Sequence, residues 1–207
     1  MSTIIHYTVN TNPNYDAERT DNIPCIRKSQ VLYNTPNLPL ASRHPKLLYW
    51  LYFDVKAGDV IIYNDANIYC LQTAEQMIER YLGNADIAIN THPYRHYLHE
   101  EFAALENKYR NESKQQMVDT LREQFICYFK DNPNVLTKNF WENNFIIRRD
   151  SPRMRSLMQL WFDELIRFQH RDQPSFPYVF SQFPDLKMNT IREGNIRENP
   201  NFIYIKH

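Results

Sequence analysis

Glycine is scarce in this chain, which has only 3 glycines among 207 residues. The glycine-rich phosphate loops GxGxxG and GxxxxGKS/T are both absent from the sequence, so the dinucleotide-binding and P-loop classes are excluded. Long apolar runs are lacking too, and no stretch approaches the ~20 apolar residues of a membrane-spanning helix. Residues 1–6 have neither the basic nor the apolar region of a secretory signal.

An excess of one charge and a cysteine framework are also missing. Lys and Arg total 24 and Asp and Glu total 24, so there is no overall positive field for nucleic acid and any phosphate binding must be local. The three cysteines, Cys25, Cys70 and Cys127, are scattered and odd in number. This usage fits neither a disulfide framework nor a cysteine zinc site. We therefore expect a cytoplasmic protein with no nucleic-acid partner.

Short apolar runs alternate with helical patterns, which predicts a single three-layer α/β domain over residues 1–207. We expect strands at residues 3–9, 26–33, 60–63, 86–89, 144–147 and 202–205. We expect helices at residues 43–52, with Pro45 in the first turn, and at 73–82, 93–109, 113–128 and 151–168. Ser113 and Gln116 form a capping-box pattern. From Phe168 to residue 202 the pattern is polar and rich in proline, and it predicts no element.

The first candidate site follows the apolar run at residues 60–63. Asp65 and Asn67 are two apart, so both side chains can present oxygen to one cation at the carboxyl end of a strand. Oxygen ligands suit Mg²⁺ or Mn²⁺, which share ligand duty with substrate phosphates. The other interpretation is a tight Asx turn.

A second candidate is a histidine-rich segment. His92, His96 and His99 are spaced by four and then three residues, which is one face of a helix. Three imidazoles can bind zinc, so a zinc hydrolase is one alternative function. Against zinc, Pro93 makes His92 an N-cap and the HExxH motif is absent. The other interpretation is a polar helix start in which Arg95 and Glu100 form a salt-bridge network.

Two further clusters carry charge. Asp172 and Arg171 follow an amphipathic helix, and a loop carboxylate beside a basic residue can act as a general base or a charge stabiliser. The alternative is a solvated helix end. Arg43 and Lys46 fall in the first turn of their predicted helix, where cations are unfavourable unless a bound phosphate reverses the sign. Here the alternative is an ordinary exposed basic turn.

A series of motifs runs in order along nearly the whole chain. They are Tyr7-Thr8, Arg43 with Lys46, Asp65-Ala66-Asn67, His92-Pro93 with Arg95 and Glu100-Glu101, Ile-Ile-Arg-Arg at 146–149, Leu160-Trp161-Phe162 with Glu164, and Arg171-Asp172-Gln173 with Ser175-Phe176. In this order they resemble the glycosyltransferase-like domain of unknown function of plant pectin- and mucilage-related proteins and their bacterial relatives. The chain is also similar to the N-terminal glycosyltransferase domain of large chlorovirus proteins that help to build capsid glycans.

The resemblance implies a GT-A-like sandwich with a central mixed, mostly parallel sheet flanked by helices, possibly the N-terminal part of a longer polypeptide. It implies sugar transfer from a nucleotide-sugar donor, a UDP-sugar, to a glycan acceptor such as a viral capsid glycan, in the host cytoplasm. A divalent metal, Mn²⁺ or Mg²⁺, is implied as cofactor.

The resemblance also assigns roles to residues. Tyr7 and Thr8 would hold uracil and ribose, Arg43 and Lys46 would neutralise the diphosphate, and Asp65 and Asn67 would hold the metal. His92, Arg95 and Arg171 would position donor or acceptor, and Asp172 would act as a base or stabilise the anomeric centre. On this interpretation Asp172→Asn lowers turnover and leaves melting temperature nearly unchanged.

Two departures from the family pattern keep a rival function open. Ala66 stands where the family has glycine, and Asn67 is an amide where GT-A enzymes usually have a second aspartate. The rival is a non-catalytic carbohydrate-binding or assembly module of the same fold.

Overall fold

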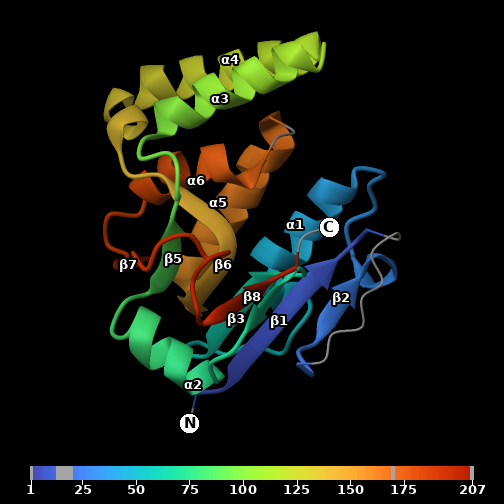
Figure 1. Cartoon of the computed structure of the whole chain (residues 1–207), viewed down its shortest axis with the longest axis vertical. Coiled ribbons are helices and arrows are strands. Elements are labelled where there is room, and N and C mark those ends of the chain that lie inside the picture. Colours follow the sequence, from blue (N-terminus) through green and yellow to red (C-terminus); the bar gives the residue numbers. More distant parts are fainter. Residues whose placement is uncertain (1, 13–20, 169–170, 206–207) are drawn as a thin grey trace.

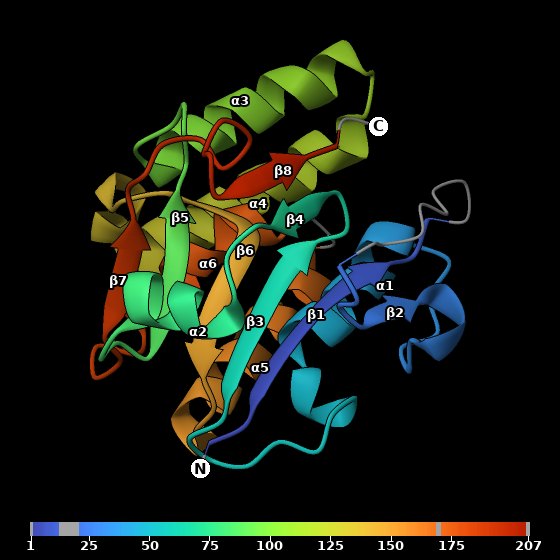
Figure 2. The ribbon, with the colours of Figure 1, turned by 60° about the horizontal axis from the view of Figure 1, so that its bottom comes forward.

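The computed structural model describes residues 2–12, 21–168 and 171–205. Its centre is a six-stranded sheet of order β2-β1-β3-β6-β5-β7. The strands are β1 (Ile4–Asn10), β2 (Cys25–Arg27), β3 (Val60–Asp65), β5 (Ile87–Thr91), β6 (Trp141–Arg149) and β7 (Met188–Ile191). Figures 1 and 2 show this sheet running through the middle of the molecule.

The sheet is mixed and mostly parallel, as the resemblance implies. Strand β1 pairs in parallel with β2 and β3, and β5 pairs in parallel with β7. Strand β6 lies antiparallel between β3 and β5. The carboxyl ends of β1, β3 and β5 therefore meet the amino end of β6 at one edge of the sheet.

Helices α1 (Leu38–Leu47), α5 (Pro152–Phe168) and α6 (Asp172–Ser181) cover one face of the sheet. Tyr7, Tyr63 and Ile146 face this layer and belong to one buried cluster with Trp161 and Phe176. Burial of these large apolar side chains is the main stabilising contribution to the domain.

The opposite face has a thinner cover. It consists of α2 (Ala74–Met77), a π-helical turn at Ile78–Leu82, and the two-stranded sheet formed by β4 (Ile68–Cys70) and β8 (Phe202–Tyr204). Ile62, Phe145 and Phe202 are among its buried members. The two covers and the sheet make three layers, which confirms the predicted α/β sandwich.

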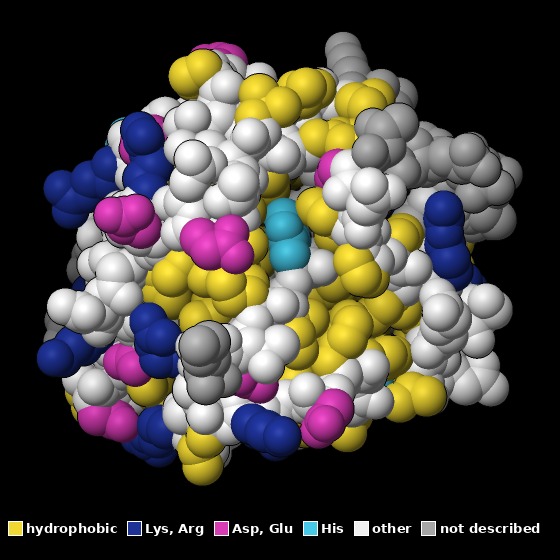
Figure 3. Space-filling model, turned by 90° about the horizontal axis from the view of Figure 1, so that it is seen from below, with side chains coloured by type: hydrophobic (Ala, Val, Ile, Leu, Met, Phe, Trp, Pro, Cys, Tyr) yellow, Lys and Arg dark blue, Asp and Glu magenta, His cyan; other side chains and the backbone are white. Residues whose placement is uncertain are grey.

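From below, apolar side chains gather at the middle of the molecular surface and charges of both signs surround them (Figure 3).

Helices α3 (Leu98–Asn111) and α4 (Gln115–Asp131) form an antiparallel hairpin at the top of Figure 1. The hairpin packs through its own cluster, which includes Phe102, Leu121 and Tyr128, and the short helical turn Pro133–Thr137 leads from it into β6. Among the described residues, no helix combines the length and apolar character needed to cross a bilayer.

Several sequence-based elements are confirmed. Helix α5 begins directly after Ser151, whose Oγ accepts a hydrogen bond of 3.0 Å from Met154 N, as its N-cap role requires. Its inward positions Met154, Leu157, Trp161 and Leu165 are all buried. The helix at residues 74–82 ends at Gly83, whose φ of +52° suits a glycine stop.

Three predicted helix starts are wrong. Helix α1 begins at Leu38 behind the N-cap Asn37, so Arg43 and Lys46 lie in its second half and Pro45 lies inside it. Helix α3 begins at Leu98 rather than at residue 93. Ser113 is not a cap, because its φ of +54° places it in a turn and α4 begins only at Gln115.

Two elements were missed after Phe168. Helix α6 is almost wholly buried although it contains Pro174 and Pro177, and β7 adds a parallel strand at the sheet edge. The strand predicted at residues 26–33 is much shorter in the structure. It is the three-residue β2, and a 3-10 turn at Lys28–Gln30 follows it.

Candidate functional site

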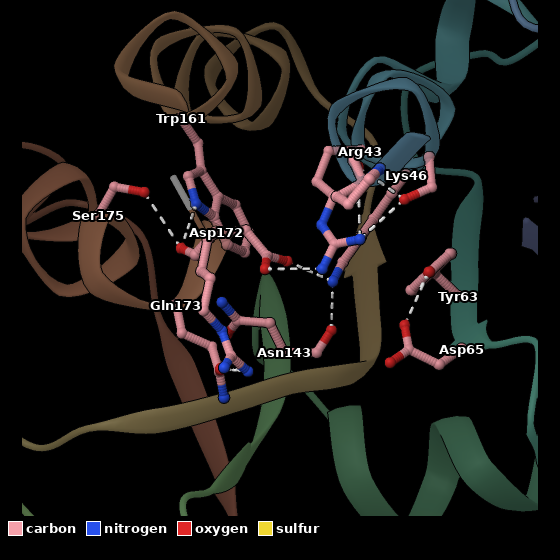
Figure 4. A network of polar contacts seen from close by, with 12 residues as sticks. Arg43, Lys46, Tyr63, Asp65, Asn143, Trp161, Asp172, Gln173 and Ser175 are labelled. Atoms are coloured by element: carbon pink, nitrogen blue, oxygen red, sulfur yellow. Dashed lines mark hydrogen bonds and ion pairs between the residues drawn. The ribbon is translucent and has the colours of Figure 1, made fainter. Parts of the chain in front are cut away.

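Buried polar side chains concentrate at the edge where β1, β3 and β5 end and β6 begins. Asn64, Asn90, Asn143 and Asn144 are each less than a tenth exposed, although an asparagine normally lies on the surface. Ligands of open α/β sheets bind outside the carboxyl ends of strands. This edge is therefore the candidate site, and Figure 4 shows part of it.

A bulge in β6 shapes the edge. The pairs Ile89↔Ile146 and Asn90↔Glu142 are consecutive along β5 but four residues apart along β6. The three extra residues in β6 run from Asn143 to Phe145. Bulges of this kind redirect side chains and are frequent beside functional sites.

Asn143 has the most unusual environment at this edge. Its backbone oxygen accepts a hydrogen bond of 2.5 Å from Lys46 Nζ. Its side chain is buried, yet among the described residues neither the amide nitrogen nor the amide oxygen has a hydrogen-bond partner. A buried amide left unpaired is costly and calls for a partner from outside the chain, such as a ligand or ordered water. Sequence reasoning missed Asn143, although the polar triplet at residues 142–144 ahead of an apolar run was visible.

Asp172 lies at the first position of α6 and points toward two cations of α1 (Figure 4). Its Oδ2 lies 2.5 Å from Lys46 Nζ, and its Oδ1 lies 3.4 Å from the Arg43 guanidinium. The backbone oxygen of Asp172 accepts hydrogen bonds from Trp161 Nε1 at 2.9 Å and from Ser175 Oγ at 3.1 Å. Asp172 and Lys46 are both buried. Hydrogen bonds to other residues hold each partner in place, because Lys46 also contacts the Asn143 carbonyl and the Asp172 backbone is held by Trp161 and Ser175.

The electrostatics of this pair restrict what Asp172 can do. Burial alone would raise the pKa of the Asp172 carboxyl, but Lys46 and Arg43 outweigh burial and hold the pKa well below its usual range. A carboxylate stabilised so strongly in its ionised form is a weak general base. The charge-stabilising role from the sequence analysis therefore fits Asp172 better than the base role.

The same geometry corrects the predicted diphosphate site. Lys46 is buried and engaged by Asp172, and the two cations do not lie at a helix N-terminus. Arg43 is different, because 30% of its side chain is exposed. Of the two, only Arg43 can meet a ligand without leaving its partner.

Asp65 and Asn67 lie at the carboxyl end of β3, one of the inner strands of the sheet. Asp65 ends β3 and its Oδ1 accepts a hydrogen bond of 2.8 Å from the Tyr63 hydroxyl. Asn67 lies in the turn to β4, and its backbone oxygen accepts a hydrogen bond from Ile205 N. Both residues are partly exposed. A carboxylate and an amide offer the hard oxygen donors that Mg²⁺ or Mn²⁺ prefers, so the donor set fits such a metal if water or phosphate completes it.

Glu142 is a second carboxylate near Asp65 that sequence reasoning missed. It lies at the start of β6, and its Oε1 forms a 2.6 Å ion pair with the Arg197 guanidinium. Burial raises the pKa of Glu142, and the nearby Asp65 charge adds to the effect. Its Oε2 is buried without a hydrogen-bond partner among the described residues.

The histidine segment does not form a zinc site. His92 caps a turn, because its Nδ1 accepts hydrogen bonds from the backbone nitrogens of Tyr94 and Arg95 at 3.2 and 3.0 Å. His99 contacts the Leu136 carbonyl oxygen at 2.9 Å instead. In the described ranges no three His, Cys, Asp or Glu side chains are grouped to hold a metal ion. Burial and the charge of Arg95 lower the pKa of His92 to about 4.

Arg95 and Arg171 both act on one buried carboxylate, Glu101. Arg95 NH1 lies 2.6 Å from Glu101 Oε2, and burial raises the pKa of Glu101 although Arg95 and Arg171 both oppose that rise. Arg171 is exposed and donates a hydrogen bond of 3.0 Å to Gln173 Oε1. Its charge acts on Asp172 as well as on Glu101.

Tyr7 and Thr8 do not reach the surface. Both are fully buried. The Tyr7 hydroxyl donates to the Pro45 carbonyl at 2.7 Å and accepts from Arg148 NH2 at 2.9 Å. The Thr8 hydroxyl donates to the Asn64 carbonyl at 2.7 Å. These two residues hold strands and α1 together, so the predicted contact with uracil and ribose does not fit the structure.

The motifs agree with the result of a family comparison. The family described as TOD1/MUCI70, glycosyltransferase-like domain, matches residues 27–199. No curated protein sequence matches significantly. Among solved structures, the apo form of mouse xyloside xylosyltransferase 1 aligns with 11% identity and a TM-score of 0.43, and the alignment covers 82% of this chain and 63% of that chain. The chain belongs to the TOD1/MUCI70 glycosyltransferase-like domain family.

Proposed function

We propose that this domain is a metal-dependent glycosyltransferase that moves a sugar from a UDP-sugar to a glycan acceptor. Family membership supports glycosyl transfer in general. The observation that carries the proposal is the strand-end edge itself, where the partly exposed Asp65 carboxylate lies beside Arg43 together with the Asn143 amide, which has no hydrogen-bond partner in the part of the chain that the structure describes. Such an edge suits a ligand that brings both phosphates and hydroxyl groups.

In this proposal Asp65 and Asn67 hold Mn²⁺ or Mg²⁺. When bound, the metal would supply positive charge that stabilises the UDP leaving group. Arg43 adds a second positive charge from α1 and is free to contact the diphosphate, since part of its side chain faces outward. The Asn143 amide can both donate to and accept from sugar hydroxyls.

Asp172 is assigned a charge role. It keeps Lys46 buried and Arg43 oriented, and its ionised carboxylate at the start of α6 can stabilise positive charge that develops on the donor sugar. Arg171, Arg95 and His92 are assigned to positioning of donor or acceptor. The similarity to chlorovirus capsid-glycan proteins makes a viral capsid glycan the first acceptor to try, and the host cytoplasm the proposed location.

The direct test is UDP release from a panel of UDP-sugars, with Mn²⁺ and with a chelator. We expect metal-dependent release for at least one sugar, and a loss of about a hundredfold or more in Asp65→Ala. The matched control is Asp54→Ala, which removes an exposed carboxylate away from this edge. Release that is equal with metal and with chelator would contradict the proposal.

The second candidate is a non-catalytic carbohydrate-binding or assembly module. The observation that favours it is the amide at Asn67, which binds a divalent cation more weakly than a carboxylate does. This alternative predicts that the domain binds a UDP-sugar or a glycan without releasing UDP under any metal condition.

A further inference from the structure

A cavity of about 380 Å³ lies beside the candidate site, between the start of α1, the end of α3, the start of α4 and Arg171. None of the residues that line it belongs to a strand. It is therefore separate from the strand ends where Asp65 lies. Arg43 joins the two places, because it lines the cavity and also pairs with Asp172.

The lining is strongly cationic. Among the described residues of the lining, Arg43, Lys108, Lys114 and Arg171 stand against a single acidic side chain, Glu112. Glu112 forms ion pairs with two lysines, with its Oε2 2.7 Å from Lys114 Nζ and its Oε1 3.9 Å from Lys108 Nζ. The whole chain has no net charge, so this excess of positive charge is a local feature and not a consequence of composition.

A helix end adds to the positive potential. Lys114 is the N-cap of α4 and offers no side-chain cap, and the first turn of α4 has no acidic residue. Lys114 and Met117 both line the cavity, so the positive end of the α4 dipole lies against it. An anion in the cavity would interact favourably with the four cations and with this helix end.

We propose that this cavity binds an acidic sugar residue of the acceptor glycan, through its carboxylate. This inference rests on the proposed glycosyl transfer and specifies the acceptor class. Arginine side chains bind carboxylates with two parallel hydrogen bonds. The apolar side chains of Pro39, Leu40 and Met117 also line the cavity and suit the face of a sugar ring. The volume suits one or two sugar units.

The test uses two matched disaccharides, one ending in glucuronate and one ending in glucose, titrated calorimetrically into the protein. The variant is the double substitution K108Q/K114Q, whose side chains are 53% and 51% exposed and whose folding should be unaffected. The control is K130Q/K138Q, which removes the same charge from exposed positions at the other end of the hairpin. UDP with Mn²⁺ is titrated into all three proteins.

We expect the glucuronate disaccharide to bind, and to bind less tightly by about tenfold or more in K108Q/K114Q, with the control unchanged. The glucose disaccharide should bind far more weakly to every protein. A matching loss of UDP affinity in K108Q/K114Q would overturn the proposal and make the cavity a site for the donor diphosphate. Equal binding of both disaccharides, or binding of neither, would also overturn it. UDP release measured in parallel separates this outcome from failure of the proposed function.

Discussion

The buried pair of Lys46 and Asp172 gives the sharpest prediction about stability. Asp172→Asn keeps the shape of the side chain and removes its charge, which leaves the buried Lys46 ammonium without its anionic partner. Removal of one member of a buried ion pair costs about 3–5 kcal/mol. We therefore expect Asp172→Asn to lower the free energy of unfolding by that amount at pH 7, contrary to the sequence-based expectation of an almost unchanged melting temperature.

The assay is urea unfolding at neutral pH, with two comparisons. Asp185→Asn removes a carboxylate from an exposed pair with Arg153, in which the side chains are 55% and 48% exposed, and should change the free energy of unfolding far less than Asp172→Asn does. The double variant K46M/D172N should lose much less than the sum of the two single variants, because it leaves no buried charge unpaired. The denaturant slope m should not change.

The pH dependence follows from the lowered pKa of Asp172. Because the folded-state pKa is depressed, the contribution to stability is present above the unfolded pKa of about 4 and is lost as the pH falls toward the folded value. The difference between the wild type and Asp172→Asn should therefore persist from about pH 7 to pH 5 and narrow in stronger acid. A loss below about 1 kcal/mol at pH 7 would show that Lys46 and Asp172 do not form a buried, coupled ion pair.

Three other substitutions test neighbouring parts of the site. Asn143→Leu should leave the free energy of unfolding unchanged or raise it by about 1 kcal/mol, because it removes an unpaired buried amide, while UDP-sugar turnover falls by about tenfold or more; a clear loss of stability in urea would show that the amide is satisfied within the chain. His92→Asn should keep the turn cap and remove the titrating imidazole. In the wild type, the free energy of unfolding should fall by up to about 3 kcal/mol between about pH 6.5 and pH 4, and this fall should be smaller in the variant. Equal pH dependence of the unfolding free energy in both proteins would contradict the lowered pKa of His92. Glu164→Gln should retain most of the turnover, because Glu164 Oε2 accepts a hydrogen bond of 2.8 Å from Tyr128 under the α4 helix and does not lie at the strand ends; a hundredfold loss of UDP release would move Glu164 into the site.

Apolar patterning was sufficient for most of the fold. The inward face of α5 and the continuous run at the start of β3 are both found where the sequence places them, because burial enforces such patterns directly. Proline misled the prediction in two places. The sequence predicts Pro45 in the first turn of a helix, but it lies inside α1, and the proline-rich pattern around Pro174 and Pro177 predicts no helix where the buried helix α6 forms. Tertiary packing overrides local propensity at these positions.

The site was only partly predictable. Asp65, Arg43 and Asp172 were all nominated from sequence, and all lie at or beside the strand-end edge. The pairing of Lys46 with Asp172 joins residues 126 positions apart, and no pattern in a single sequence reports such a contact. The unpaired Asn143 amide depends on the bulge in β6, which is a property of strand register. The resemblance assigns Tyr7 and Thr8 to uracil and ribose, but both are fully buried, and a β-rich run does not reveal which of its hydroxyls the core will use.

In the proposed function, nucleotide binds at the carboxyl end of the sheet together with a metal held by Asp65. Calorimetric titration of UDP into the wild type and into Asp65→Asn, with Mn²⁺ and then with EDTA, tests it most directly. We predict that the wild type binds UDP at least about tenfold more tightly with Mn²⁺ than with EDTA, and that Asp65→Asn binds weakly in both conditions. Equal UDP affinity of the wild type with Mn²⁺ and with EDTA would contradict the claim.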